Sequence, residues 1–563
     1  MCRGQKCPLL FFIFFLFLSF FTSAEEISDF WDIAPAETIA DVLLAKMNTE
    51  EKISQLFLVG YDDSTADPAI ISWIKRYGLG GVKIFGRNAE EIEPLIKAIE
   101  QYQKTALTRR FGIPLFIATD QEGGWVRHIK GDTVMTPGNM AIGATELPYE
   151  AYITGLYINR ELAVLGINMN FAPTVDVYIN PEAHVIGPRA FSSDAALTAK
   201  LSLAFMHGSL EAGVIPVAKH FPGHGNAKGD SHNELPTIED DIDTLWERDW
   251  LPYRLMIPDG LPAIMVGHLN FPKITENSTP TTLSPIIIKL LREKLGFSGL
   301  VLTDDLYMNG ARAVGEDMPQ IVVDAIKAGN NMLLLSDAPA PGDKIWNAVI
   351  KEYNKNPDFK KQVDYSVKKI LLTKLAFIKK KNKTELLPNR EEAARILPDK
   401  EAEEAFTQQA LRSVTIIKNA DIPYTSDNKE KILITGQYTR YINAGKKFFP
   451  SAETFYFSYL PFYFASSKVK TWLKNNSKYY DKIIFCLMNP NSLEVLKELE
   501  EYREKIIVIS TLTPVYLEQV PWVKTAIAVY GTTDANFEAG FLTLTGKIEA
   551  EGKLPVRLYN KEK

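Results

Sequence analysis

Polar and charged side chains follow five apolar segments in the first part of this 563-residue sequence. They are Asp120, Gln121 and Glu122 after 114–119, Asp176 after 170–175, Lys219 and His220 after 214–218, His268 after 263–267, and Asp304 and Asp305 after 299–303. In parallel α/β domains the carboxyl ends of the strands meet at one face, where function is found. A single Asp there is usually a helix cap, but five polar strand ends together predict an active site.

The densest cluster is the segment KHFPGHGNAKGDSH, residues 219–232, which holds three of the seven histidines. Its glycines and its proline predict a loop. Histidine and aspartate are suitable metal ligands, so a metal site is one reading. However, a Pro-Gly turn separates His220 from His224, whereas zinc ligands usually form close pairs on a helix. We therefore predict no metal and no cofactor.

Acid–base chemistry is the second reading of this loop. Asp230 and His232 are two residues apart, so in an extended loop both side chains point the same way and the carboxylate can orient the imidazole. Histidine titrates near neutral pH and can both donate and accept a proton. Asp304 ends an apolar strand, where a carboxylate can attack an electrophilic carbon and form an ester. A structural Asp–His hydrogen bond is the alternative for the pair, and Asp305 is expected to be a cap or an ion-pair partner.

Eight apolar segments must position these residues, and amphipathic helical patterns separate them. The segments are 56–60, 80–85, 114–119, 169–173, 214–219, 263–267, 299–303 and 331–335. This alternation predicts an α/β fold, most simply a (β/α)8 TIM-type barrel, with an open doubly wound sheet as the alternative. Helices are expected at 89–110 and at 284–296, the second with Ser284 as its N-cap and a proline after it.

A charged, proline-punctuated stretch follows at 378–404, and a second set of apolar segments comes after it. These segments, at 414–418, 431–435, 482–487, 505–510 and 525–530, predict a smaller α/β sandwich domain. We divide the chain into a signal peptide (1–24), a catalytic barrel (25–380), a linker with its following helix (381–404) and the C-terminal domain (405–563).

The composition is that of a globular protein, with 46% hydrophobic and 23% charged residues. A net charge of −6 argues against a nucleic-acid partner. Residues 9–21 form an apolar run between two positive charges and small residues, which is typical of a secretory signal peptide. We expect an exported, periplasmic or secreted protein with no membrane span after cleavage. An uncleaved anchor is the alternative, although the run is short of the ~20 residues that span a bilayer.

These motifs resemble glycoside hydrolase family 3, specifically its β-N-acetylhexosaminidase branch. The resemblance covers most of the first domain, and the long loop from Lys219 to Pro236 is its specific element. The matching segments are 47–60, 78–88, 120–124, 161–177, 185–194, 219–236, 281–285 and 295–308.

The resemblance implies an exo-acting retaining β-N-acetylglucosaminidase that acts on an oligosaccharide or glycopeptide, such as peptidoglycan fragments or chito-oligosaccharides. It implies Asp304 as nucleophile, His232 as general acid/base and Asp230 as the partner of that histidine, where most retaining enzymes use two carboxylates. A neutral base does not repel anions, so phosphate as well as water could intercept the glycosyl-enzyme. The implied substrate-binding residues are Asp120, His128, Arg189, Lys219 and His220.

The sequence departs from the family pattern in DQEGGWVRH, residues 120–128, where the family commonly has DQEGGRVxR. Trp125 and His128 replace arginines. Arg127 could substitute from the neighbouring position, but a shift of one residue reverses side-chain direction in an extended segment. The alternatives are therefore a family 3 β-glucosidase or broad β-glycosidase, a catalytically silent glycan-binding protein and a metal-dependent hydrolase.

Overall fold

A computed structural model describes residues 27–275, 278–313, 315–340, 342–380, 386–426, 429–457 and 467–558. The predicted signal peptide lies outside the described residues. Eight strands form the first sheet, and each lies in a predicted segment. They are β1 (Phe57–Val59), β2 (Gly81–Ile84), β3 (Phe116–Thr119), β6 (Met169–Asn170), β7 (Ile215–Phe221), β8 (Ala263–Val266), β9 (Leu300–Thr303) and β10 (Leu333–Leu335).

The first sheet is a barrel. All its strand pairs are parallel and follow chain order from β1 to β9, while β10 pairs with β1. A parallel bridge from Leu302 to Met332 joins β9 to the start of β10. The strands are buried on both faces, which explains their continuous apolar sequences. The predicted (β/α)8 architecture is confirmed, and the doubly wound alternative is wrong because such a sheet does not return to its first strand.

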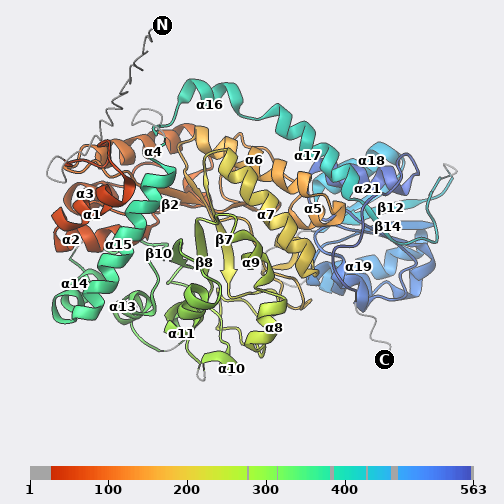
Figure 1. Cartoon of the computed structure of the whole chain (residues 1–563). Helices are drawn as coiled ribbons and strands as arrows, with labels where there is room; N and C mark the ends of the chain where they lie inside the picture. Colours follow the sequence, from red (N-terminus) through yellow and green to blue (C-terminus); the bar gives the residue numbers. More distant parts are fainter. Residues whose placement is uncertain are drawn as a thin grey trace, which may run out of the picture.

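Helices surround the barrel (Figure 1). They are α1 (Ala36–Lys46), α2 (Thr49–Gln55), α3 (Pro68–Tyr77), α4 (Ile92–Leu107), α5 (Asn139–Thr145), α6 (Pro148–Val164), α7 (Ala195–Glu211), α8 (Ile242–Glu247), α9 (Leu251–Met256), α10 (Pro272–Thr275), α11 (Pro285–Lys289), α12 (Asn309–Arg312), α13 (Met318–Ala328), α14 (Lys344–Lys355) and α15 (Pro357–Phe377). The helix predicted at 89–110 is α4. The one predicted at 284–296 begins where expected, but Ser284 makes no side-chain capping bond, and a π-helical turn, Leu290–Lys294, completes it.

A six-stranded sheet forms the second unit, in the order β11-β16-β15-β14-β12-β13. Its strands are β11 (Thr415–Lys418), β12 (Ile432–Gly436), β13 (Glu453–Tyr456), β14 (Lys482–Leu487), β15 (Ile506–Ser510) and β16 (Thr525–Ala528). All neighbours are parallel except β11 and β16. The five predicted strands are confirmed. Strand β13 was not predicted, because it is a largely exposed edge strand without an apolar run.

Helices α18 (Thr439–Phe448), α19 (Ser467–Asn476), α20 (Pro490–Lys497) and α21 (Asp534–Leu544) cover this sheet. Two more, α16 (Arg390–Ile396) and α17 (Lys400–Ser413), run from the barrel to it (Figure 1). The predicted domain boundary falls inside α17 and stays a prediction. The C-terminal segment returns to the barrel, where Lys553 N–H donates to the Ala144 carbonyl and Ser193 N–H to the Pro555 carbonyl.

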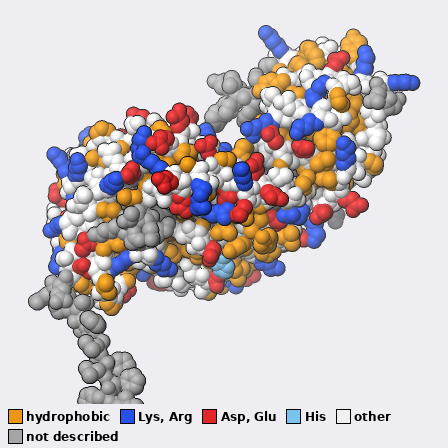
Figure 2. All heavy atoms as spheres, turned by 90° about the horizontal axis from the view of Figure 1, so that it is seen from above, with side chains coloured by type: hydrophobic (Ala, Val, Ile, Leu, Met, Phe, Trp, Pro, Cys, Tyr) orange, Lys and Arg blue, Asp and Glu red, His pale blue; other side chains and the backbone are white. Residues whose placement is uncertain are grey.

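The surface in Figure 2 carries lysine and arginine side chains interspersed with aspartate and glutamate. That face therefore has no single-sign charge field of the kind that binds nucleic acid. Among the described residues, no helix combines the length and the apolar character needed to cross a bilayer.

Candidate active site

A pocket of 320 Å³ opens at the carboxyl ends of the barrel strands. Seven of the eight predicted site residues line it, namely Asp120, His128, Arg189, Lys219, His220, His232 and Asp304. The eighth, Asp230, is hydrogen-bonded to His232. The structure thus brings together side chains from six strand ends and from the long loop, as the strand-end pattern predicted.

Asp304 follows β9 and faces this pocket. One carboxylate oxygen accepts a hydrogen bond from the Asp305 N–H at 2.8 Å. Burial opposes its ionisation, but neighbouring His268 and His220, this N–H and Lys219 outweigh that effect and hold the pKa of Asp304 below its usual value. The residue is therefore a carboxylate at neutral pH, as a nucleophile must be.

Asp305 has a different role. Its side chain accepts hydrogen bonds from the backbone N–H groups of Ser336 and Tyr307 at 3.0 and 3.1 Å. Burial raises its pKa. The carboxyl group caps the turn after β9, in agreement with the capping role expected for it.

Asp230 and His232 form the predicted pair, with 2.6 Å between Asp230 Oδ1 and His232 Nδ1. The segment is a turn and not extended: the same Oδ1 accepts the His232 N–H, and the N–H groups of Asn233 and Glu234 donate to the Asp230 carbonyl. The bond to Asp230 is the largest effect on His232, and it raises the pKa of the imidazole. Because Nδ1 is engaged, Nε2 is the nitrogen left free, on a side chain that is 60% exposed.

Four of the charged residues are already paired with one another. Lys219 Nζ lies 2.5 Å from both Asp120 and Glu122, and Arg189 binds Glu122 through two nitrogens at 2.8 and 2.9 Å. The predicted binding residues are thus held in fixed orientations before any ligand arrives.

Lys219 and His220 lie inside β7, and not after it as predicted. The pairing of β7 with β8 is irregular between Ala218 and Phe221. Neighbouring residues of a regular strand face opposite sides, but such a bulge re-aims side chains, so both residues line the pocket.

Asp176 fixes the start of the long loop from beneath. Its carboxylate accepts from His220 Nδ1 and from the His224 N–H, both at 2.7 Å. The side chain of Asp176 is buried, and it is absent from the pocket lining. It therefore supports the residues that line the pocket.

The hairpin of β4 (Gln121–Gly123) and β5 (Val126–Arg127) departs from the expected geometry. Arg127 turns away from the pocket, where its guanidinium donates to the carbonyls of Lys130 and Thr133. It cannot replace an arginine at position 128. His128 does line the pocket, and Lys83, which the sequence analysis did not identify, lies 3.3 Å from its Nδ1.

The remaining histidines have structural surroundings. His268 is buried and bonds to Thr282 and to the Asp305 carbonyl, whereas His207 pairs with Asp259 on the surface. In the part of the chain that the structure describes, no three His, Cys, Asp or Glu side chains are grouped so that they could hold a metal ion.

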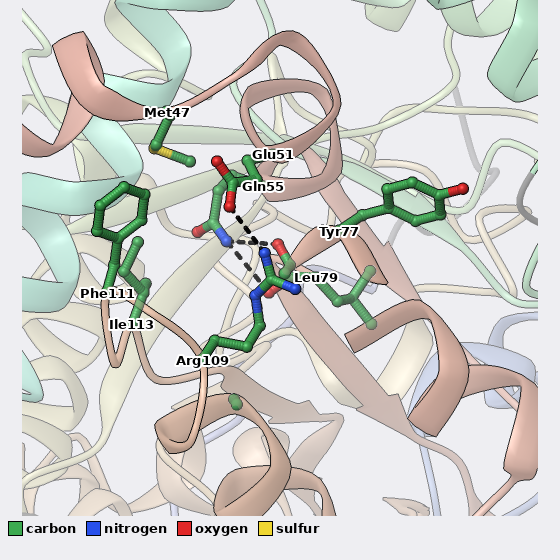
Figure 3. Close-up of a pocket in the computed structure, with 10 residues that line it drawn as sticks. Met47, Glu51, Gln55, Tyr77, Leu79, Arg109, Phe111 and Ile113 are labelled. Carbon is green, nitrogen blue, oxygen red and sulfur yellow. Dashed lines mark hydrogen bonds and ion pairs between the residues drawn. The ribbon is translucent and has the colours of Figure 1, made fainter. Parts of the chain in front are cut away.

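A second pocket lies at the opposite end of the barrel (Figure 3). Gln55, Leu79 and Ile113 line it, and they precede β1, β2 and β3 respectively. Its volume is 20 Å³, which is space for about one water molecule. Only the pocket at the carboxyl ends, of these two, could hold a sugar ring.

Comparisons with known proteins agree with this geometry. A sequence profile described as "Glycosyl hydrolase family 3 N terminal domain" matches residues 48–372. Beta-hexosaminidase A of Pseudoalteromonas piscicida is 38% identical over 263 residues, which is 44% of this chain and 44% of that protein. Beta-hexosaminidase of Methylobacillus flagellatus is 35% identical over 279 residues, which is 47% of this chain and 76% of that protein.

Among solved structures, a glycoside hydrolase family 3 beta-N-acetylglucosaminidase from Paenibacillus sp. str. FPU-7 is similar over both units. It is 27% identical, its TM-score is 0.81, and the match covers 91% of this chain and 99% of that one. The profile match spans more than half of the sequence. The chain therefore belongs to glycoside hydrolase family 3.

Proposed function

We propose that this chain is an exo-acting retaining β-N-acetylhexosaminidase that removes terminal N-acetylglucosamine by a double displacement. The observation that carries the proposal is the meeting of ionised Asp304, deep in the pocket, with the half-exposed Asp230–His232 pair at its mouth. Its relatives named beta-hexosaminidase support the same reaction.

In the first step the Asp304 carboxylate attacks the anomeric carbon and the bond from that carbon to the leaving oxygen breaks. His232 gives its Nε2 proton to the leaving oxygen. Its pKa above the ordinary histidine value favours the protonated form that this step needs. Asp230 stabilises the imidazolium through the bond to Nδ1.

In the second step His232 is neutral and accepts a proton from water at Nε2. The water oxygen forms a bond to the anomeric carbon while the ester bond to Asp304 breaks, which restores both groups. Two inversions give net retention. Phosphate can take the place of water, because a neutral imidazole does not repel it.

The paired side chains around the pocket suit the hydroxyl and N-acetyl groups of one terminal sugar. Asp120, Lys219, Arg189 and His220 offer donors and acceptors in fixed directions. We propose as substrates peptidoglycan fragments or chito-oligosaccharides, and we propose export of the chain from its signal-like N-terminal sequence.

A panel of p-nitrophenyl glycosides tests the activity on the purified protein. The glucosaminide should be turned over with a much higher kcat/KM than the galactosaminide or the glucoside. A preference for the glucoside would replace the proposal by a β-glucosidase, and no turnover by a silent glycan-binding protein. EDTA should leave the rate unchanged, and product analysis in phosphate buffer should show whether a sugar phosphate forms.

A further inference from the structure

Lys83 is the central residue of β2 and a wall of the pocket, although no part of its side chain reaches solvent. Its Nζ lies 4.8 Å from the centre of the Phe85 ring and 5.0 Å from that of Phe171. A buried lysine is costly unless its ammonium group is fully paired, so its partners indicate its role.

The ammonium group has three hydrogens and three partners. They are Asp120 Oδ2 at 2.5 Å, His128 Nδ1 at 3.3 Å and the Ile84 carbonyl at 3.2 Å. No hydrogen is left for a ligand. Lys83 therefore acts on a bound molecule only through Asp120 and His128, both of which face the pocket.

The contact with Lys83 determines the tautomer of His128. An ammonium group donates and never accepts, so Nδ1 of the imidazole must carry the lone pair and Nε2 the hydrogen. Burial, and then the charge of Lys83, lower the pKa of His128 to about 4. At neutral pH the ring is therefore an uncharged donor with its N–H at Nε2.

We propose that Lys83 is a positioning residue that holds the Asp120 carboxylate and locks His128 as a neutral Nε2–H donor to one sugar hydroxyl. The pair of Lys83 and His128 does the work of the cation that the family pattern places at position 128. This inference rests on the proposed function for the existence of a bound sugar, but the state of His128 does not.

The electrostatics of the cluster lead to a specific dependence between the two positions. Lys83 already supplies the positive charge beside Asp120, so an arginine at 128 in the native chain would put two cations next to each other. If Lys83 is replaced by an apolar residue, the same arginine would instead restore the missing charge. Each change should be harmful alone and much less harmful when combined.

The first experiment is ¹⁵N NMR of the His128 imidazole, which reads the tautomer and the pKa without substrate. The native protein should give a neutral ring with the proton on Nε2. In Lys83→Met the proton should move to Nδ1 or become shared between the nitrogens, and the pKa should rise because the neighbouring cation is lost. Lys374→Met is the matched control, since Lys374 is also fully buried but lies at the far end of the barrel. An unchanged His128 spectrum in folded Lys83→Met would overturn the proposal.

The second experiment measures KM and kcat for Lys83→Met, His128→Arg and the double variant on whichever aryl glycoside the enzyme cleaves. Each single change should raise KM about tenfold or more with a smaller effect on kcat, while the double variant should return to within a few fold of the native KM. Losses that multiply in the double variant would contradict the proposal. If no glycoside is cleaved, the proposed function fails, and the NMR result still decides the role of Lys83.

Discussion

The two ends of the barrel bury similar groups and use them differently. At the amino end of the strands, Glu51 is bound by Arg109 and Arg110 and also accepts the Asn48 N–H, while Lys374 Nζ donates to Gln55 and to the Gly80 carbonyl. These groups leave a space of 20 Å³ (Figure 3). At the carboxyl end a denser set of charges surrounds 320 Å³.

The difference lies in what each cluster leaves unused. Around Glu51 the charges face one another, so the cluster joins α2 to the loop after α4 and adds to stability. Around Asp304 the charges also pair, but the nucleophile and the outer nitrogen of His232 remain directed at open space. Buried charge alone is therefore a poor guide to function in this fold, whereas charge at the carboxyl ends beside an opening is a good one.

The largest expected contrast is between Asp304→Ala and Glu51→Ala. The first should lower kcat by about 10⁴-fold or more, with little change in the thermal midpoint, because it removes the attacking group. The second should cost about 3–5 kcal/mol of folding free energy, because two arginines lose their carboxylate, yet the folded enzyme should keep its kcat. Steady-state kinetics and thermal unfolding on both variants measure the contrast, and a loss of kcat in folded Glu51→Ala would break it.

The next effect concerns leaving groups. His232→Ala should lower kcat/KM by about 10²–10⁴-fold on natural oligosaccharides, since their leaving oxygen needs a proton. Aryl glycosides with acidic leaving groups should lose much less. Kinetics on a series of aryl leaving groups provides the measurement, and equal losses across the series would exclude His232 as the acid. His207→Ala, at an exposed histidine away from the pocket, is the control.

A smaller effect is expected on the pH profile. The carboxylate of Asp230 raises the pKa of His232, so Asp230→Asn should lower it. Because the protonated imidazole is the active form in the first step, the alkaline limb of kcat/KM should move to lower pH in this variant. Profiles on a substrate with a poor leaving group test this, and an unmoved alkaline limb would show that Asp230 does not tune the acid.

The smallest effect on activity is expected from Lys374→Met. Two hydrogen-bond acceptors lose their donor at the amino end, so the thermal midpoint should fall, by about 1–3 kcal/mol in folding free energy. KM and kcat should not change, since nothing at that end contacts the pocket. A changed KM would mean that the two ends are coupled.

The barrel was predictable because fully buried strands leave continuous apolar runs, and the residues that follow those runs include most of the pocket. What failed had weaker signals. The edge strand β13 has no apolar run, and the turn that pairs Asp230 with His232 depends on backbone hydrogen bonds between nearby residues. Lys83 sits inside the apolar segment GGVKIF, so its meeting with Asp120 and His128 needed the three-dimensional arrangement.

The central claim is that Asp304 forms the covalent glycosyl-enzyme, and trapping that intermediate tests it most directly. Incubation with a slowly hydrolysed fluorinated glycoside, followed by proteolysis and mass spectrometry, should place the sugar on the peptide that contains Asp304, and Asp304→Ala should not be labelled. A label on a different residue, or turnover of the native enzyme with inversion at the anomeric carbon, would contradict the account.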